Sequence, residues 1–150
     1  MLIKSRRATP AAPHPRAPFS ASMAFPTSGA LQLPLLLCIS DTYRGRYGWR
    51  HQIGPWVRAG YRVIAPDMLG YGGTDKPRAA EEYSMRRLCA DLAAILDVVG
   101  VHKAVSARSA HACDCDVDFA VQIVIGHDWG SFTAARFALW HPNRLLALAL

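Results

Sequence analysis

The sequence predicts an α/β fold, a mostly parallel sheet with flanking helices, of which only the N-terminal part is present. Two observations predict it. From residue 33 onward, short apolar runs alternate with longer stretches whose apolar residues recur every three to four positions. The chain then stops at Leu150, inside its last apolar run. We therefore expect an incomplete domain over residues 33–150.

The expected elements follow one another as strand, helix, strand, helix, strand, helix and strand. The strands are residues 33–39, 61–65, 123–125 and 145–150, and the helices are residues 49–59, 82–99 and 129–140. Gly60 and Gly100 end the first two helices, and Pro66 closes the second strand. The expected spatial order of the strands is second, first, third, fourth, because helical crossovers between parallel strands are right-handed.

The third strand is interrupted. It begins at Lys103-Ala104-Val105 and gives way to a polar stretch from Ser106 through Asp118. The apolar run resumes only at Phe119 and ends in Ile123-Val124-Ile125-Gly126. Removing residues 105–122 would leave Lys103-Ala104 followed directly by Ile123-Val124-Ile125-Gly126, a continuous buried strand. Codons for Val-Ser and for Gln can supply the GT and AG ends of an intron. Our hypothesis is that these eighteen residues are translated intron sequence, which sequencing of the transcript would decide.

Residues 1–32 are expected to be disordered. The segment is basic, contains no acidic residue and five prolines, and has no helical or strand periodicity. Its charge weakly resembles a mitochondrial targeting sequence, but the prolines would break the amphipathic helix that such sequences form.

Composition favours a soluble globular protein. The 150 residues are 51% hydrophobic, and no apolar run reaches the roughly 18 residues of a membrane span. The net charge of +6 is not gathered into a dense basic patch with interleaved aromatic residues. Neither a membrane span nor a nucleic-acid partner is therefore expected.

The four cysteines indicate neither a disulfide framework nor a metal centre. Cys38, Cys89, Cys113 and Cys115 lack the spacing of either. His111, Cys113 and Cys115 alternate in an Asp-rich stretch, which places ligands poorly for a tetrahedral zinc ion. We expect reduced thiols, no metal, no cofactor and a cytoplasmic location.

The motif that carries chemistry is Gly126-His127-Asp128-Trp129-Gly130, which follows an apolar strand and opens a helix. This is the context of a nucleophile elbow, where small flanking residues let the backbones approach. Backbone N–H groups at the helix start favour an anion. Asp128 is therefore the expected nucleophile.

An aspartate at this position selects the substrate. A carboxylate that attacks an ester forms a mixed anhydride, whereas attack on a saturated carbon forms an alkyl ester that water can cleave. Epoxides and alkyl halides are the main electrophiles of that kind. The competing interpretation is that Asp128 is only a helix N-cap, for which Asp is favoured. His127, next to the nucleophile, is expected to be structural rather than a catalytic base.

Three segments of the sequence resemble the epoxide-hydrolase branch of the α/β-hydrolase family. They are Gly48-Trp49-Arg50-His51-Gln52, the stretch from Tyr61 to Asp75 with Gly70-Tyr71-Gly72-Gly73-Thr74, and Gly126 to Ser131. The resemblance implies an α/β-hydrolase fold and an epoxide as substrate. It also implies that Asp128 forms an ester with the substrate and that the backbone N–H of Trp129 supplies half of the oxyanion hole.

Other parts of the family's pattern are missing. The resemblance implies a His with an acid partner and two tyrosines that protonate the epoxide, all of which would lie beyond Leu150. A His-Gly-x-Pro turn that completes the oxyanion hole is replaced by residues 40–46, Ser-Asp-Thr-Tyr-Arg-Gly-Arg. A haloalkane or haloacetate dehalogenase of the same fold is the alternative activity. A non-catalytic fragment is the other alternative, and the chain as written is expected to be inactive.

Overall fold

The computed structural model describes residues 21–24, 33–40, 45–101 and 122–150. Its strands are β1 (Ala21–Ala24), β2 (Leu35–Ile39), β3 (Arg62–Pro66), β4 (Gln122–Gly126) and β5 (Ala147–Ala149). The α-helices are α1 (Arg50–Arg58), α2 (Met85–Val98) and α3 (Trp129–Trp140). Short 3-10 helices span Gly45–Trp49, Ala80–Tyr83 and Pro142–Arg144.

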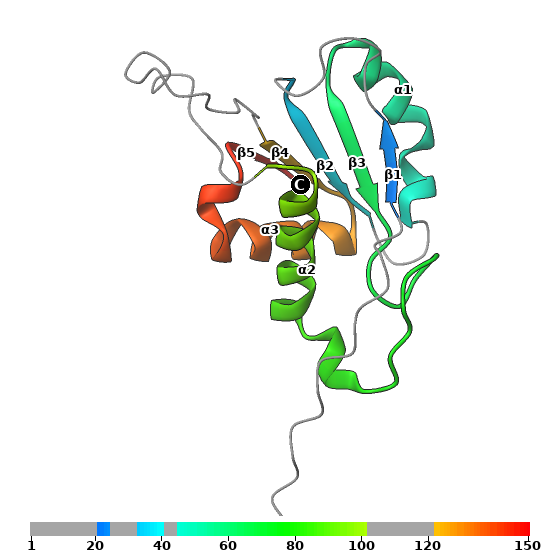
Figure 1. The fold of residues 1–150 in the computed structure, drawn as a ribbon, viewed down its shortest axis with the longest axis vertical. Coiled ribbons are helices and arrows are strands. Elements are labelled where there is room, and N and C mark those ends of the chain that lie inside the picture. The colour runs from blue at the N-terminus through cyan, green and yellow to red at the C-terminus, as the bar shows by residue number, and fades with distance from the viewer. Residues whose placement is uncertain (1–20, 25–32, 41–44, 102–121) are drawn as a thin grey trace, which may run out of the picture.

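The strands form one sheet in the order β1-β3-β2-β4-β5 (Figure 1). β2 pairs in parallel with β3 and with β4, and β4 pairs in parallel with β5. Leu37 lies opposite Ile64 on one side and Val124 on the other. The predicted order of the four parallel strands is confirmed, and so is the α/β fold class.

The expectation of disorder across residues 1–32 is wrong for Ala21–Ala24. These residues form β1, which runs antiparallel to β3 with Ala21 opposite Pro66 and Ala24 opposite Val63. Without β1, the backbone N–H and C=O groups on one side of β3 would lack strand partners. The sequence of β1, Ala-Ser-Met-Ala, has no β-branched or aromatic residue and so carries no strand signal. Residues 1–20 and 25–32 lie outside the described residues.

β2 is buried on both faces of the sheet, since its successive side chains point in opposite directions and enter two separate clusters. Leu35, Leu37 and Ile39 of β2 pack with apolar residues of α2 and α3 in one cluster. Leu36 and Cys38 pack in a second cluster with Trp49 and side chains of α1. In Figure 1, α2 and α3 lie in front of the sheet, and α1 packs against its other face. The predicted burial of this strand on both faces is confirmed.

Several element boundaries differ from the prediction, the start of α2 by the most. α2 begins at Met85 rather than at residue 82, because Ser84 is extended (φ −60°, ψ 140°) and separates it from the 3-10 helix before it. β4 begins at Gln122 rather than at residue 123. β5 is limited to Ala147–Ala149, although a longer strand over residues 145–150 was expected. The rest of the predicted insertion, residues 105–121, lies outside the described residues.

Arg144 ties the end of α3 to the end of α2. Its Nη2 donates to the Asp97 carboxylate at 2.7 Å and lies 2.8 Å from the Val101 carbonyl oxygen and 3.3 Å from that of Ala93. The side chain is 16% exposed. The last carbonyl groups of a helix have no donor within the helix. Arg144 therefore supplies a charged donor to carbonyl groups at the C-terminal end of α2.

We expect Arg144→Ala to lower the free energy of unfolding by about 1–3 kcal/mol, because buried carbonyl groups lose a charged donor. Arg144→Lys should recover only part of this loss, since the lysine side chain is one atom shorter and its ammonium does not reach the position of Nη2. Urea denaturation measures both variants. Arg136→Ala, which removes an arginine lying over the Phe132 ring, is the control and should change stability little. Equal values for Arg144→Ala and the control would contradict the role assigned to Arg144.

β5 ends the sheet on the side away from β1. Its residues are exposed, and Leu146, Leu148 and Leu150 are 41%, 38% and 68% exposed. An apolar strand at the edge of a sheet is a template for pairing with another chain.

A polypeptide of these 150 residues is therefore expected to self-associate at micromolar concentration. Leu148→Lys should shift it toward the monomer, because a charged side chain on an edge strand opposes pairing. Leu139→Lys is the matched control, since Leu139 is 63% exposed but lies on α3. Sedimentation velocity follows all three proteins. A wild-type chain that is monomeric over the whole concentration range would refute this expectation.

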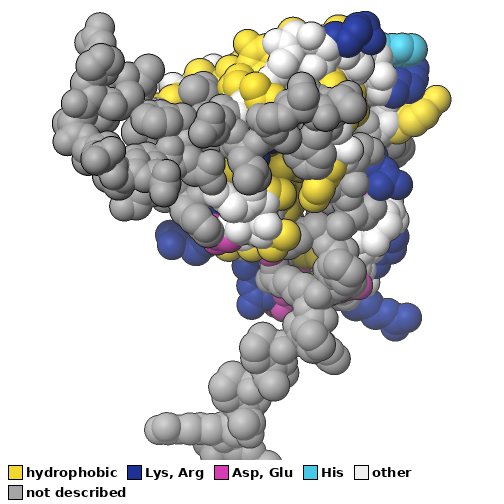
Figure 2. Space-filling model, turned by 45° about the horizontal axis from the view of Figure 1, so that its top comes forward, with side chains coloured by type: hydrophobic (Ala, Val, Ile, Leu, Met, Phe, Trp, Pro, Cys, Tyr) yellow, Lys and Arg dark blue, Asp and Glu magenta, His cyan; other side chains and the backbone are white. Residues whose placement is uncertain are grey.

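On one face of the molecule the charged side chains do not form a single patch (Figure 2). On the face seen in Figure 2, the Lys and Arg side chains are spread around the margin, with apolar side chains between them. Within the described ranges, no helix is both long enough and apolar enough to cross a membrane.

Candidate active site

Asp128 lies in the turn between β4 and α3 and has a left-handed backbone. Its φ is 55° and its ψ is −127°, and it is the only non-glycine residue with positive φ among those that the structure describes. Such a conformation is costly for a residue with a side chain and is retained where the surroundings enforce it. The backbone on either side is hydrogen-bonded, from Gly130 N–H to the His127 carbonyl at 3.0 Å and from Ser131 N–H to the Asp128 carbonyl at 2.9 Å.

The two flanking glycines let the turn approach its neighbours. A Cβ at Gly130 would overlap the backbone of Ile39 and Ser40 at the end of β2, and a Cβ at Gly126 would overlap the backbone of Ser131. His127 N–H donates to the Ile39 carbonyl at 2.9 Å. The turn is thus held against the carboxyl end of β2, which is where open parallel sheets bind ligands.

The side chain of Asp128 is exposed and does not cap the helix. Asp128 occupies the N-cap position of α3, but its carboxylate makes no capping hydrogen bond. Trp129 is the first helical residue, and an N–H at that position has no partner within its own helix. The helix start favours negative charge there. The geometry therefore argues against the interpretation of Asp128 as a simple N-cap.

His127 packs on an aromatic cluster behind the turn. Its ring meets Trp49 edge to face, with centroids 6.2 Å apart, and Trp49 in turn lies 5.8 Å from Trp56. This packing contact is consistent with the predicted structural role of His127, which stays a prediction.

A hollow of about 380 Å³ lies next to the turn. Trp129 and Phe132 of α3 form one side, and Leu69 and Tyr71 of the loop after β3 form another. Ser40, at the end of β2, also lines it, whereas Asp128 is not among its lining residues. The walls are mainly apolar and aromatic, as in sites for small organic molecules.

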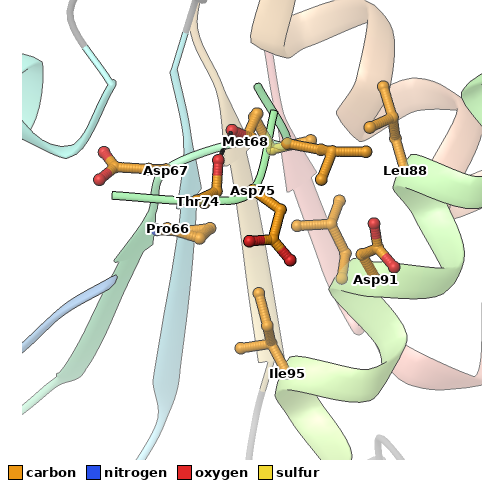
Figure 3. Close-up of a pocket in the computed structure, with 10 residues that line it drawn as sticks. Pro66, Asp67, Met68, Thr74, Asp75, Leu88, Asp91 and Ile95 are labelled. Atoms are coloured by element: carbon orange, nitrogen blue, oxygen red, sulfur yellow. Dashed lines mark hydrogen bonds between the residues drawn. The ribbon is translucent and has the colours of Figure 1, made fainter. Parts of the chain in front are cut away.

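A second, smaller cavity of about 30 Å³ lies beneath that loop. Figure 3 shows the side chains of Asp75 and Asp91 at this cavity, with Ile95 of α2 below them. Its volume is enough for about one water molecule. It does not hold a substrate-sized ligand.

The two histidines that flank α3, His127 and His141, do not provide a base for Asp128. His127 is its sequence neighbour and turns to Trp49. His141 follows the far end of α3, whose 12 residues span about 18 Å. Burial, and then the charge of Arg144, lower the pKa of His141. This histidine is too distant to assist a reaction at Asp128.

The structure leaves some predicted features untested. Residues 41–44, most of the turn that replaces the family's oxyanion segment, lie outside the described residues. His111, Cys113 and Cys115 lie outside them as well. Among the described residues, no group of three or more potential metal ligands is present. Cys38 and Cys89 are free thiols, and burial raises their pKa to about 12 and about 11.

Asp67, immediately after β3, is a buried residue that the sequence analysis did not single out. It is 6% exposed, and its carboxylate accepts hydrogen bonds from two backbone segments. The available signal was an acidic residue directly after an apolar strand and shortly before the turn Gly70-Tyr71-Gly72-Gly73. An aspartate in that context reads as an ordinary turn residue, so the signal is weak.

Comparison with known proteins relates this geometry to other chains. A family model for the alpha/beta hydrolase fold matches residues 34–107. "Epoxide hydrolase A" of Mycobacterium tuberculosis is 41% identical over 103 residues, which cover 69% of this chain and 26% of that protein. "Epoxide hydrolase 3" of Siraitia grosvenorii is 36% identical over 115 residues, covering 77% of this chain and 31% of that protein.

Solved structures of epoxide hydrolases are also similar to this chain. An epoxide hydrolase of Vigna radiata is 26% identical with a TM-score of 0.65, covering 85% of this chain and 32% of that one. Epoxide hydrolase A of Mycobacterium thermoresistibile is 32% identical with a TM-score of 0.63, covering 87% of this chain and 38% of that one. The chain thus spans about a quarter to two fifths of the length of these proteins.

Proposed function

Since the chain belongs to the α/β-hydrolase family and is similar to epoxide hydrolases, we propose that Asp128 is the nucleophile that opens an epoxide. One carboxylate oxygen attacks a saturated ring carbon, and the bond from that carbon to the epoxide oxygen breaks. The oxygen takes a proton from water, which leaves a 2-hydroxyalkyl ester on Asp128 and a hydroxide ion in solution. In the complete reaction, water attacks the ester carbonyl and releases a diol.

The observation that carries this proposal is the exposed carboxylate on a left-handed backbone. Asp128 has φ 55° although it carries a side chain. At the glycines on either side of the turn, Gly126 and Gly130, a side chain would overlap neighbouring backbone atoms. Strain of this kind is kept at sites where a side chain must point in a particular direction. A helix cap does not need it, since a capping aspartate has an ordinary extended backbone.

Trp129 is proposed to assist through its backbone. As the first residue of α3, it offers an N–H with no partner in its own helix. That donor would hold the oxygen of Asp128 that does not attack and would stabilise the oxyanion when water cleaves the ester. One such donor contributes about 10²–10³-fold to the rate in other enzymes.

In a polypeptide of these 150 residues the reaction is proposed to stop at the ester. Ester cleavage needs a general base to activate water, and such a group contributes typically about 10²–10⁴-fold. His127 and His141, the histidines on either side of α3, are not placed for that task. A small molecule should therefore accumulate on the chain rather than turn over.

A halide-releasing activity is the second candidate. Trp129 is 66% exposed and directly follows Asp128, so its indole N–H is available to a halide leaving group. The chemistry at Asp128 would be identical, since a carboxylate displaces either leaving group from a saturated carbon. The similarity to epoxide hydrolases favours the epoxide.

Intact-mass spectrometry of the chain incubated with styrene oxide, or separately with benzyl chloride, tests both candidates. We expect one added styrene oxide per chain, little diol, and slower reaction with the halide. Asp128→Asn should lose the adduct, whereas Glu81→Gln, which removes an exposed carboxylate elsewhere, should retain it. Repeated turnover to diol that Asp128→Asn abolishes would disprove the arrest at the ester. A faster reaction with benzyl chloride would favour the second candidate.

A further inference from the structure

We propose that Asp67 is a positioning residue for the hollow beside Asp128. Its buried carboxylate fixes the loop Met68–Asp75, which forms one wall of that hollow. The inference rests on the proposed function insofar as it takes the hollow to be where the substrate binds. Asp67 itself does not touch the reacting atoms.

Asp67 joins two loops at the carboxyl edge of the sheet. It accepts a hydrogen bond from the backbone N–H of Arg46 at 3.2 Å and one from that of Gly73 at 3.4 Å. The guanidinium of Arg46 lies 3.6 Å from the same carboxylate. Since the side chain is 5% exposed, water competes little for these interactions.

Two glycines in these loops pack closely against the carboxylate of Asp67. Gly45 and Gly72 both have positive φ, 45° and 52°, and a Cβ on either would overlap Asp67. Loops with this geometry can close over Asp67 only if both positions lack a side chain. The close approach from both sides indicates that the carboxylate is the centre on which the two loops are built.

The loop that Asp67 holds is a compact unit. Gly70 N–H donates to the Asp75 carbonyl at 2.9 Å, and the Thr74 hydroxyl lies within hydrogen-bonding distance of the carbonyl oxygens of Met68 (2.9 Å) and Tyr71 (2.7 Å). Figure 3 shows the contact between Thr74 and Met68, with Asp67 pointing away from Asp75 and Asp91. A loop bonded to itself in this way moves as one body when its anchor is lost.

The wall and the nucleophile are anchored separately. Met68, Leu69 and Tyr71 of the loop line the hollow opposite Trp129 and Phe132. Asp128, by contrast, is held by the contacts of its own turn with the end of β2. Loss of the Asp67 anchor should therefore weaken binding in the hollow and leave the intrinsic reactivity of Asp128 nearly unchanged.

The test is Asp67→Asn, which keeps the shape of the side chain and removes its charge and one acceptor. The rate of styrene oxide addition to Asp128 is measured against styrene oxide concentration. We expect the half-saturating concentration to rise about tenfold, as for loss of a hydrogen bond to a charged group, and the limiting rate to change less than twofold. Asp97→Asn, which breaks a carboxylate contact with Arg144 at the other end of α2, should leave the half-saturating concentration unchanged.

A second measurement separates this inference from the proposed function. Binding of the product diol, phenylethanediol, is followed through the backbone amide signals of Tyr71 and Gly130, which requires no reaction at Asp128. Weaker diol binding in Asp67→Asn supports the positioning role even if no adduct ever forms, in which case the proposed function alone fails. Unchanged diol binding in a folded Asp67→Asn chain overturns the inference. If the Asn variant does not fold, Asp67→Glu, which keeps the charge but shifts the carboxylate, is measured instead, with the same criteria.

Discussion

Gly130→Ala is expected to destabilise the chain by about 1–3 kcal/mol or more and to abolish adduct formation at Asp128. The added methyl group would overlap the carbonyl group of Ile39 and the backbone of Ser40, which are main-chain atoms of β2 and its end and cannot rotate away. Relief requires α3 to move off the sheet. That movement breaks the hydrogen bond from His127 N–H to Ile39 and displaces the carboxylate of Asp128.

Gly54→Ala is the matched control for this substitution. Gly54 lies inside α1, where the new methyl group would meet only the mobile end of the Arg58 side chain at 3.4 Å. Replacing a helical glycine by alanine ordinarily stabilises by roughly 0.5–1 kcal/mol. Urea denaturation and the adduct assay are applied to both. Equal stability of the two variants would show that the turn is not packed against β2 as described.

Deletion of residues 105–122 is expected to raise the free energy of unfolding by about 1–3 kcal/mol or more. Gln122 begins β4 opposite Leu35 and is 1% exposed, and among the described residues neither its amide oxygen nor its amide nitrogen has a hydrogen-bond partner. In the shortened chain Ala104 would take this place in the strand. The deletion therefore replaces a buried, unpaired amide by a small apolar residue, as the proposal of a translated intron implies.

Gln122→Val separates the effect of the amide from that of the deletion. If the unpaired amide is the main reason that the deletion stabilises the chain, Gln122→Val should give most of the same increase in the free energy of unfolding. Valine favours strands and has no polar group to bury. Urea denaturation compares the single substitution, the deletion and the wild type. A deletion variant that fails to fold would show that residues 105–122 belong to the native structure.

The sheet could be predicted because its pattern is apolar and periodic. β2, β3 and β4 are short apolar runs, and the crossover rule places them in order once they are recognised. β1 could not be predicted, because Ala21–Ala24 contain no β-branched or aromatic residue that would indicate a strand. The start of α2 was misplaced because acidic residues at 81 and 82 suit a helix start as well as the 3-10 turn that they form.

The site was predictable in part for the same physical reason. Gly126 and Gly130 around Asp128 predict a tight turn in which a side chain at either glycine would clash. The structure shows which backbone atoms such side chains would overlap. The hollow could not be predicted, because Leu69, Tyr71, Trp129 and Phe132 meet only after the loop folds over Asp67. Long-range contacts of this kind, such as that between Arg46 and Asp67, have no local sequence signature.

Peptide-level mass spectrometry after incubation with styrene oxide is the decisive test of Asp128 as the nucleophile. Epoxides also alkylate thiols, but burial raises the pKa of Cys38 to about 12 and that of Cys89 to about 11, so these two carry almost no thiolate at pH 7.5. An ester is cleaved by alkali and a thioether is not, which separates a carboxylate adduct from any thiol adduct. We expect one alkali-labile adduct on the peptide that contains Asp128, and none in Asp128→Asn. An unmodified Asp128 in a folded chain, with any adduct confined to cysteine, would contradict the role of Asp128 as the nucleophile.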